Sequence, residues 1–212
     1  GRMWSDGQVR VTGREYTALL ETPCHTRGEL SCLSCHQLHG ADPDDQLAPA
    51  ARGDAACTSC HAPKASREHT RHAALACVDC HMPRTTYGLL KAIRSHVIDS
   101  PDLTTTLATG RPDACSLCHV DRPLAWTADW LARWYGRPRP DLPPEHRATS
   151  AAVLWAIRGD AGQRALAADA LGHPQARAAA GDDWQAPILA HLLQDPYDAV
   201  RQIAARSLRH SR

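Results

Sequence analysis

Apolar residues recur at helical spacing through the last third of the chain, where alanine is frequent and cysteine is absent. This periodicity predicts four helices, over residues 145–158, 160–171, 183–193 and 196–210. The residues predicted to cap these helices or to open a first turn are Asp160, Asp183, Asp195 and Pro196. The residues expected to form the inward face of the last helix are Val200, Ile203, Ala204 and Leu208.

The pattern is shorter and more varied at the start of the chain. Residues 1–23 combine glycine, polar residues and brief β-branched runs, which predicts an extended arm with one short hairpin. Residues 65–76 predict a helix. Residues 87–96 predict a short amphipathic helix with three residues on its apolar side. These three residues are Leu89, Ile93 and His96.

Three further segments complete the division of the chain. Residues 99–112, rich in Thr and Pro, predict an exposed loop. Residues 124–135 predict a helix with a packing stripe of three tryptophans, Trp126, Trp130 and Trp134. Four prolines between residues 138 and 144 predict a stiff linker. The predicted fold is mainly α with extensive loops, divided into an N-terminal arm (1–23), a first domain (24–136), a linker (137–144) and a helical domain (145–212).

The sequence Cys-x-x-Cys-His occurs four times between residues 32 and 119. Two thiols at this spacing reach the two vinyl groups of one porphyrin, and the histidine that follows lies beneath the ring to ligate iron. Zinc is the alternative, but a four-thiolate zinc site has no use for the trailing histidine. Four copies therefore predict four covalently bound haem c groups in the first domain. The predicted thioether cysteines are Cys32, Cys35, Cys57, Cys60, Cys77, Cys80, Cys115 and Cys118, and the predicted proximal iron ligands are His36, His61, His81 and His119.

Composition agrees with a haem-filled core. The 212 residues include no Phe and only 5% aromatics, so porphyrins would supply the apolar surface that aromatic side chains usually bury. The formal net charge is +1, and no basic patch marks a nucleic-acid site. Among the 24 Lys and Arg residues, only Lys64 and Lys91 are lysines. Arginine pairs well with haem propionates, although a codon-usage bias explains the same excess equally well.

Histidines outside the motifs offer sixth ligands for iron. His69 and His72 share one face of the predicted helix between the second and third motifs. His96 lies on the apolar side of its predicted helix. His39 follows His36 too closely to reach the opposite face of the same ring, so it would serve a neighbouring haem. Four candidates for four irons predict bis-histidine ligation throughout.

Several reactive side chains remain outside this scheme. Cys24 has no partner within the chain for a disulfide. With Pro23 and His25 it resembles a haem motif that lacks its first cysteine, and a single thioether is conceivable there. A free thiol packed near the first haem is the favoured interpretation. The histidines expected on the surface or at helix caps are His146, His173, His191 and His210.

Cellular location follows from the cofactor. No apolar run approaches the length of a transmembrane helix, so no membrane span is predicted. Haem is attached to such motifs outside the cytoplasmic membrane, which predicts an exported protein, periplasmic or extracellular. Gly1 is then expected to follow a removed export segment.

Two resemblances refine the domain picture. Residues 192–208 resemble a HEAT repeat, with its aspartate-proline turn, Val-Arg pair and small-residue helix, and two repeats would cover residues 145–212 as a small α-solenoid. Residues 22–136 resemble a family of bacterial multihaem c-type cytochromes. The resemblance rests on Pro23 and Cys24 and on segments 27–36, 80–83, 87–96 and 114–119.

The cytochrome resemblance implies electron transfer and a helical-repeat region behind the haems. Relatives tend to carry an aromatic residue at the position of His25, so no ligand role transfers to it. We therefore predict an exported tetrahaem electron carrier with no catalytic residues, serving redox partner proteins and open to self-association into an oligomer or filament. The alternatives are a nitrite or hydroxylamine reductase, which needs a five-coordinate haem, and a subunit whose repeats dock an enzyme.

Overall fold

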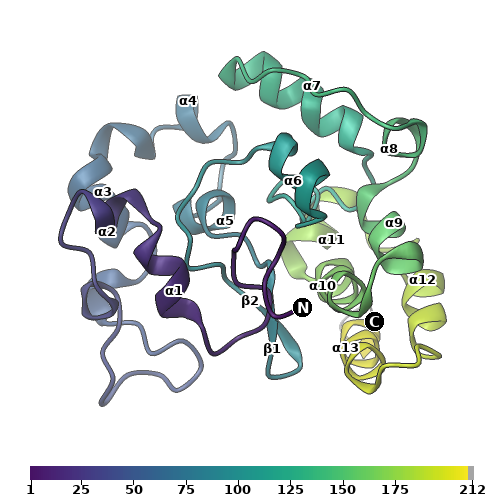
Figure 1. The fold of residues 1–212 in the computed structure, drawn as a ribbon, viewed down its shortest axis with the longest axis horizontal. Helices are drawn as coiled ribbons and strands as arrows, with labels where there is room; N and C mark the ends of the chain where they lie inside the picture. Colours follow the sequence, from purple (N-terminus) through teal and green to yellow (C-terminus); the bar gives the residue numbers. More distant parts are fainter. Residues whose placement is uncertain (210–212) are drawn as a thin grey trace.

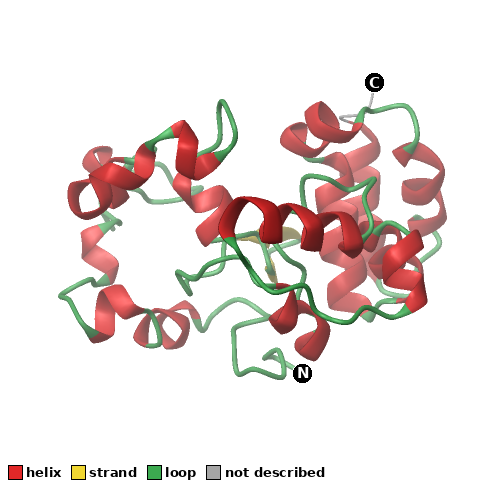
Figure 2. Cartoon of the chain, turned by 90° about the horizontal axis from the view of Figure 1, so that it is seen from above, coloured by secondary structure: helices red, strands yellow, loops and turns green. Residues whose placement is uncertain are grey.

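The computed structural model describes residues 1–209, so the predicted surface residue His210 lies outside the described part. The chain is mainly helical with long connections, as predicted. Figure 1 shows the early helices on one side, the last helices packed on the other, and a small β-hairpin between them. Figure 2 shows the same separation from above, with helices dominating both sides.

The elements divide at the proline-rich segment. Before it lie α1 (Glu15–Leu20), α2 (Pro23–Thr26), α3 (Ala55–His61), α4 (Arg67–Thr70), α5 (Cys77–His81), β1 (Thr86–Gly88), β2 (Lys91–Ile93), α6 (Leu103–Thr109) and α7 (Leu124–Tyr135). Short 3-10 turns cover Cys32–Ser34, Pro49–Ala51 and Ala62–Ala65. After it lie α8 (Pro144–Ala148), α9 (Ala151–Arg158), α10 (Ala161–Gly172), α11 (Pro174–Ala180), α12 (Gln185–Leu192) and α13 (Asp198–Arg209).

Residues 1–12 form hydrogen bonds with the β1–β2 hairpin and the residue just before it. Arg10 O accepts from Tyr87 N at 2.8 Å, and Thr12 N donates to Tyr87 O at 2.9 Å. Trp4 is 4% exposed, and its Nε1 donates to Thr85 O at 3.2 Å. The expected short hairpin reduces to one antiparallel bridge between residues 3 and 9, and α1 follows within the segment predicted to be extended.

The amphipathic helix predicted over residues 87–96 is wrong, because this segment forms the β1–β2 hairpin. Leu89 and Ile93 are four residues apart, which mimics a helical stripe. The residues that are buried instead alternate along the strands, at Thr86, Gly88 and Ala92. The β-branched residues just before the turn favour a strand, and this preference outweighs the helical spacing.

Two neighbouring predictions also need correction. The helix predicted over residues 65–76 is confined to α4, since Arg71 adopts a left-handed conformation (φ 56°) that ends it. The loop predicted over residues 99–112 contains α6. Asp102 caps α6 by accepting from Thr104 N at 2.9 Å, and Gly110 closes it with φ 73°. Threonine-rich composition concealed this helix, whose Leu103 is buried.

The helix predicted over residues 124–135 is confirmed by α7. In the helical tail, several helices begin or end at other residues than predicted. Residues 145–158 form α8 and α9 because Ser150 caps a new helix, its Oγ accepting from Val153 N at 3.1 Å. Asp160 is confirmed as the cap of α10, accepting from Gly162 N at 3.0 Å. Asp183 is not a cap, since Trp184 holds that position in α12. Pro196 precedes α13 and lies outside its first turn.

The largest hydrophobic core joins the tail to the last part of the motif region. It contains Leu117, Val120 and Leu124 together with Leu171, Leu189 and Ile203. Helix α10 is central, packing against α9, α12 and α13. Gly172 permits this approach, because a Cβ there would lie 2.3 Å from the Cβ of Ser207. Among the described residues, no helix is both long and apolar enough to cross a membrane.

Candidate haem-binding sites

Each Cys-x-x-Cys-His sequence forms about one turn of helix. His36 N donates to Cys32 O, and His119 N donates to Cys115 O, both at 2.8 Å. The second motif forms the end of α3, and the third motif forms the whole of α5. A helical turn places residues three and four apart on one side, so the thiols and the histidine of each motif can face a single flat ligand. Within the described structure, none of the nine cysteines forms a disulfide.

Three of the four motif histidines face a histidine from elsewhere in the chain. The ring centres of each pair are 6.1 Å apart, and the pairs are His36 with His96, His81 with His69, and His119 with His72. The interplanar angles are 24°, 1° and 43° in that order. In every pair, one ring follows two motif cysteines and the other was expected to be a distal ligand.

This spacing fits two imidazoles that share one iron. An imidazole nitrogen lies about 2 Å from a metal that it ligates, and the ring centre lies roughly 1 Å further away. Two rings on opposite faces of a porphyrin therefore have centres about 6 Å apart. Direct stacking would bring the rings much closer. The residues present thus fit covalent haem at the first, third and fourth motifs.

Hydrogen bonds orient several of these rings. The Nδ1 atoms of His36, His72 and His81 lie 3.0, 2.7 and 2.7 Å from the carbonyl oxygens of residues 45, 70 and 99. A ring that donates from Nδ1 to a carbonyl presents its unprotonated Nε2 on the opposite side, as metal-binding histidines commonly do. The backbone therefore fixes both the tautomer and the direction of these candidate ligands.

A thiol of one motif lies near a thiol of the next motif along the chain. Burial, together with the nearby Asp54 and Cys57, raises the pKa of Cys77 to about 12. Burial likewise raises the pKa of Cys118 to about 11, with Asp79 and Cys80 adding to the effect. Cys57 thus neighbours Cys77, and Cys80 neighbours Cys118. Haems held by consecutive motifs would lie in close succession.

A buried carboxylate lies inside the third motif. The Asp79 side chain is 7% exposed, forms an ion pair with Arg94 at 2.7 Å, and accepts from Gln175 Nε2 at 3.0 Å and Ala76 N at 3.0 Å. Burial alone would raise the pKa of Asp79, but these donors outweigh burial and lower it. The carboxylate therefore stays charged next to the thiols of this motif.

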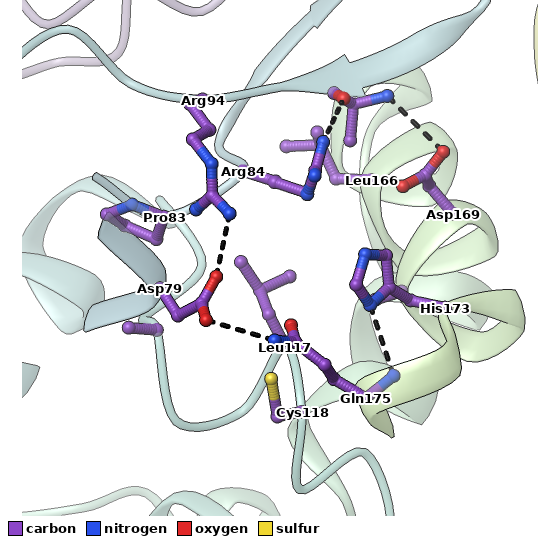
Figure 3. A pocket seen from close by; sticks show the side chains of 13 residues that line it. Asp79, Pro83, Arg84, Arg94, Leu117, Cys118, Leu166, Asp169, His173 and Gln175 are labelled. Atoms are coloured by element: carbon purple, nitrogen blue, oxygen red, sulfur yellow. Dashed lines mark hydrogen bonds and ion pairs between the residues drawn. The ribbon is translucent and has the colours of Figure 1, made fainter. Parts of the chain in front are cut away.

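Asp79 also borders a small cavity between the motif region and the tail, drawn in Figure 3. The cavity volume is about 30 Å³, which is room for a water molecule or two. Arg84 and Arg94 line one side, while Asp169 of α10, Gln175 of α11 and His173 between these helices line the other. Gln175 connects the tail directly to Asp79, so the tail contributes to the surroundings of the third motif.

The tryptophans of α7 cover the fourth motif. The Trp126 ring lies 4.5 Å from the His119 ring, and the Trp134 ring lies 5.9 Å from the His72 ring. Trp130 lies between them, 6.0 Å from Trp126 and 4.6 Å from Trp134. The stripe packs along the predicted ligand pair, which agrees with the packing role expected for it.

The second motif differs from the other three. His61 and Cys60 are exposed, and no ring contact of His61 occurs within residues 1–209. His39 is also exposed and is not brought against a motif histidine in the described part of the chain. His25 is half-buried, and its Nδ1 lies 2.8 Å from Leu30 O.

The other histidines have ordinary positions. His173 caps α11, accepting from Gln175 N at 3.4 Å, and His191 is exposed, as expected of both. His146 is half-buried in α8, so the exposed position expected for it is not fully realised. None of the three has a ring contact with a motif histidine in the described structure.

Comparison with known proteins gives one match. The family model of the doubled CXXCH motif matches residues 25–66, which include the first two motifs. No curated protein and no solved structure matches the chain. The doubled motif indicates covalently bound haem c. Together with the four motifs, this match supports a multihaem c-type cytochrome.

Proposed function

We propose that this chain transfers electrons through four covalently attached haem c groups outside the cytoplasmic membrane. The observation that carries the proposal is the 6.1 Å spacing found three times between a motif histidine and a second histidine. Two histidine ligands close both axial positions of an iron, which suits electron transfer better than substrate binding. Bis-histidine ligation also favours lower potentials than Met/His ligation.

Haem iron supplies the one-electron chemistry when bound, and the residues of this chain determine where each iron lies. The paired cysteines would hold the porphyrin edges, and the carbonyl oxygens that hold the Nδ1 atoms would direct the histidines toward the iron. The proximity of Cys57 to Cys77 and of Cys80 to Cys118 supports a continuous order of sites. Such an order would carry electrons from one end of the motif region to the other.

We further propose that residues 145–212 form a HEAT-like unit that meets redox partners or a second copy of the chain. Helices α12 and α13 pack together and both contact α10, as stacked helical pairs do. The turn between α12 and α13 contains Asp195, whose carboxylate accepts from Tyr197 N at 2.8 Å and pairs with Arg164 at 2.5 Å. This arrangement supports an ordered repeat turn.

The test begins with the mature chain produced in cells that attach haem to exported proteins. Intact mass and a pyridine haemochrome assay should give four haems for each chain. The oxidised and reduced optical spectra should be those of low-spin haem. A chain that carries fewer than four haems, or that binds zinc at the motifs, would contradict the proposal. Native sizing of the same sample measures self-association.

A small-oxyanion reductase is the second candidate, and one observation favours it. His61 is exposed and has no histidine against it among residues 1–209, so an open axial position at the second motif would be accessible to a substrate. Turnover of nitrite or hydroxylamine with a chemical reductant would support this function. An electron carrier should show no turnover above that of free haem.

A further inference from the structure

We infer that Arg111 is a positioning residue for His81, the histidine of the third motif. The inference rests on the proposed function, because His81 is the proximal ligand of one of the four proposed haems. Arg111 acts through Asp99, whose backbone carbonyl orients the His81 ring. Exchange of Arg111 should therefore change the electronic properties of a single haem.

The His81 ring is oriented by a distant part of the chain. Its Nδ1 lies 2.7 Å from Asp99 O, and Asp99 N donates to His81 O at 3.2 Å. These two residues are 18 positions apart, whereas the carbonyl oxygens beside Nδ1 of His36 and His72 come from residues only 9 and 2 positions away. Residues 98–102 belong to no helix or strand. The Asp99 carbonyl therefore needs a tether from outside its own segment.

The side chain of Arg111 supplies this tether. Its Nη2 donates to Asp99 Oδ2 at 3.1 Å, and its Nε lies 3.5 Å from Asp6 Oδ2. The guanidinium thus spans two carboxylates, one beside the His81 contact and one in the N-terminal segment. Arg111 is only 7% exposed, so salt and solvent screen these pairs weakly. A planar fork that reaches two carboxylates at once is a geometry that arginine offers and lysine does not.

The backbone of Arg111 is fixed in its turn. Arg111 follows Gly110, which ends α6 in a left-handed conformation, and Arg111 N donates to Thr109 Oγ1 at 3.0 Å. Arg111 and Asp99 also border a cavity of about 20 Å³ that Cys80 of the third motif lines. The ion pair therefore lies beside the third motif, and it is anchored to the end of a helix.

The expected effect on iron has a definite sign. A carbonyl that accepts the Nδ1 proton of an imidazole makes the ring a stronger donor through Nε2. Stronger donation stabilises ferric iron relative to ferrous iron, so loosening the Asp99 carbonyl should raise the potential. The charge of Arg111 acts in the opposite direction, because removing a nearby cation favours the ferric state. Arg111→Lys separates the two effects, since it keeps the charge and loses the fork.

The test compares Arg111→Lys with Arg164→Lys in the haem-loaded chain. Arg164 is a matched control in α10, because two of its nitrogens hold the buried Asp195 carboxylate at 2.5 and 3.1 Å. Potentiometric titration and EPR of the low-spin ferric haems are recorded, and the low-spin signal that His69→Ala removes identifies the third haem. In Arg111→Lys, the reduced-to-oxidised ratio of that haem at a fixed potential should rise about two- to tenfold, as loss of one hydrogen bond predicts. Its g values, which depend on the orientation of the axial imidazoles, should also change. The other three haems, and all four in Arg164→Lys, should keep their native values.

The opposite results are equally clear. A folded Arg111→Lys protein with four native potentials and native g values would overturn the inference. Shifts of equal size in Arg164→Lys would also overturn it, since they would show a general response to lost stability. Asp99→Asn takes the place of an Arg111→Lys chain that does not fold, and unchanged g values of the third haem in that variant would again refute the role of Arg111. Failure of the proposed function itself would appear separately, as fewer than four haems in the native chain.

Discussion

Replacing Asp79 with Asn should destabilise the protein, because Asp79 is the buried charge that joins the third motif to the tail. Its carboxylate is held by Arg94 at 2.7 Å, Gln175 at 3.0 Å and the backbone N–H of Ala76 at 3.0 Å. Asn retains the shape and can still accept a hydrogen bond. It removes the charge that Arg94 faces and places two donor hydrogens among groups that also donate.

The expected magnitude follows from these contacts. A hydrogen bond to a charged group contributes about 1.5–3 kcal/mol, and breaking a fully buried ion pair costs about 3–5 kcal/mol. Arg94 is 28% exposed and still donates to Val78 O at 2.8 Å, so in Asp79→Asn its guanidinium keeps part of its solvation and hydrogen bonding. We therefore expect Asp79→Asn to lower the free energy of unfolding by about 2–3 kcal/mol.

The assay is guanidinium unfolding of the haem-loaded protein, followed by far-UV circular dichroism. The matched control is Asp129→Asn, since Asp129 and Arg139 form an ion pair at 2.7 Å with side chains 66% and 61% exposed. That change should cost less than about 0.5 kcal/mol. Equal effects of the two variants would refute the argument that burial gives the Asp79 contacts their weight.

The pH dependence of the same comparison has a definite sign. The folded pKa of Asp79 is lowered, so its stabilising charge is complete above the unfolded value of about 3.9 and is lost as pH falls through the folded pKa. The stability difference between native protein and Asp79→Asn should be constant from pH 7 to about pH 5 and shrink below about pH 4. A difference that grows on acidification would contradict the assignment.

Three other predictions concern ligands, packing and charge. Alanine at any one of the proposed distal histidines should give about one CO-binding haem per reduced chain, measured by CO titration; these histidines are His69, His72 and His96. Gly172→Ala should lower the free energy of unfolding by about 2–3 kcal/mol, because its Cβ would lie 2.7 Å from the Cα of Ser207; equal denaturation midpoints for variant and native chain would contradict this. Burial alone would raise the pKa of Asp195, but Arg164 and the N–H of Tyr197 outweigh burial and lower it. In acid unfolding below about pH 4, the free energy of unfolding should therefore fall less steeply with decreasing pH for Asp195→Asn than for the native chain.

The motif residues could be predicted from sequence because their chemistry depends on local spacing alone. One helical turn brings two thiols and a histidine together wherever the motif occurs, as Cys32 to His36 and Cys115 to His119 show. Which distal histidine faces which motif depends on tertiary structure. His72 follows the second motif closely in sequence, yet it faces His119 across 6.1 Å.

The wrong helix prediction over residues 87–96 has an identifiable cause. The four-residue spacing of Leu89 and Ile93 mimics a helical stripe, but Leu89 and Leu90 form the tip of the hairpin with φ of 50° and 56°. Leu89 is 79% exposed there. Hydrophobic periodicity assumes that apolar residues are buried, and it fails where they lie exposed on a turn. Helix α7 was predicted correctly because Leu124 and Leu131 are buried at the helical spacing.

The third and fourth motifs are more buried than the first and second, and the tail explains why. Leu33 in the first motif is 68% exposed, whereas Ser116 and Leu117 in the fourth are 1% and 9% exposed. The fourth motif lies in the core shared with the tail helices and under the tryptophans of α7, while the third contacts the tail through Asp79. The first and second motifs receive no such cover from the described residues of the tail. Because a charged iron is harder to accommodate where water is excluded, this difference in burial should give the proposed haems different potentials even with identical axial ligands. The tail therefore acts on the haem region through packing and charge, whether or not it also meets a partner.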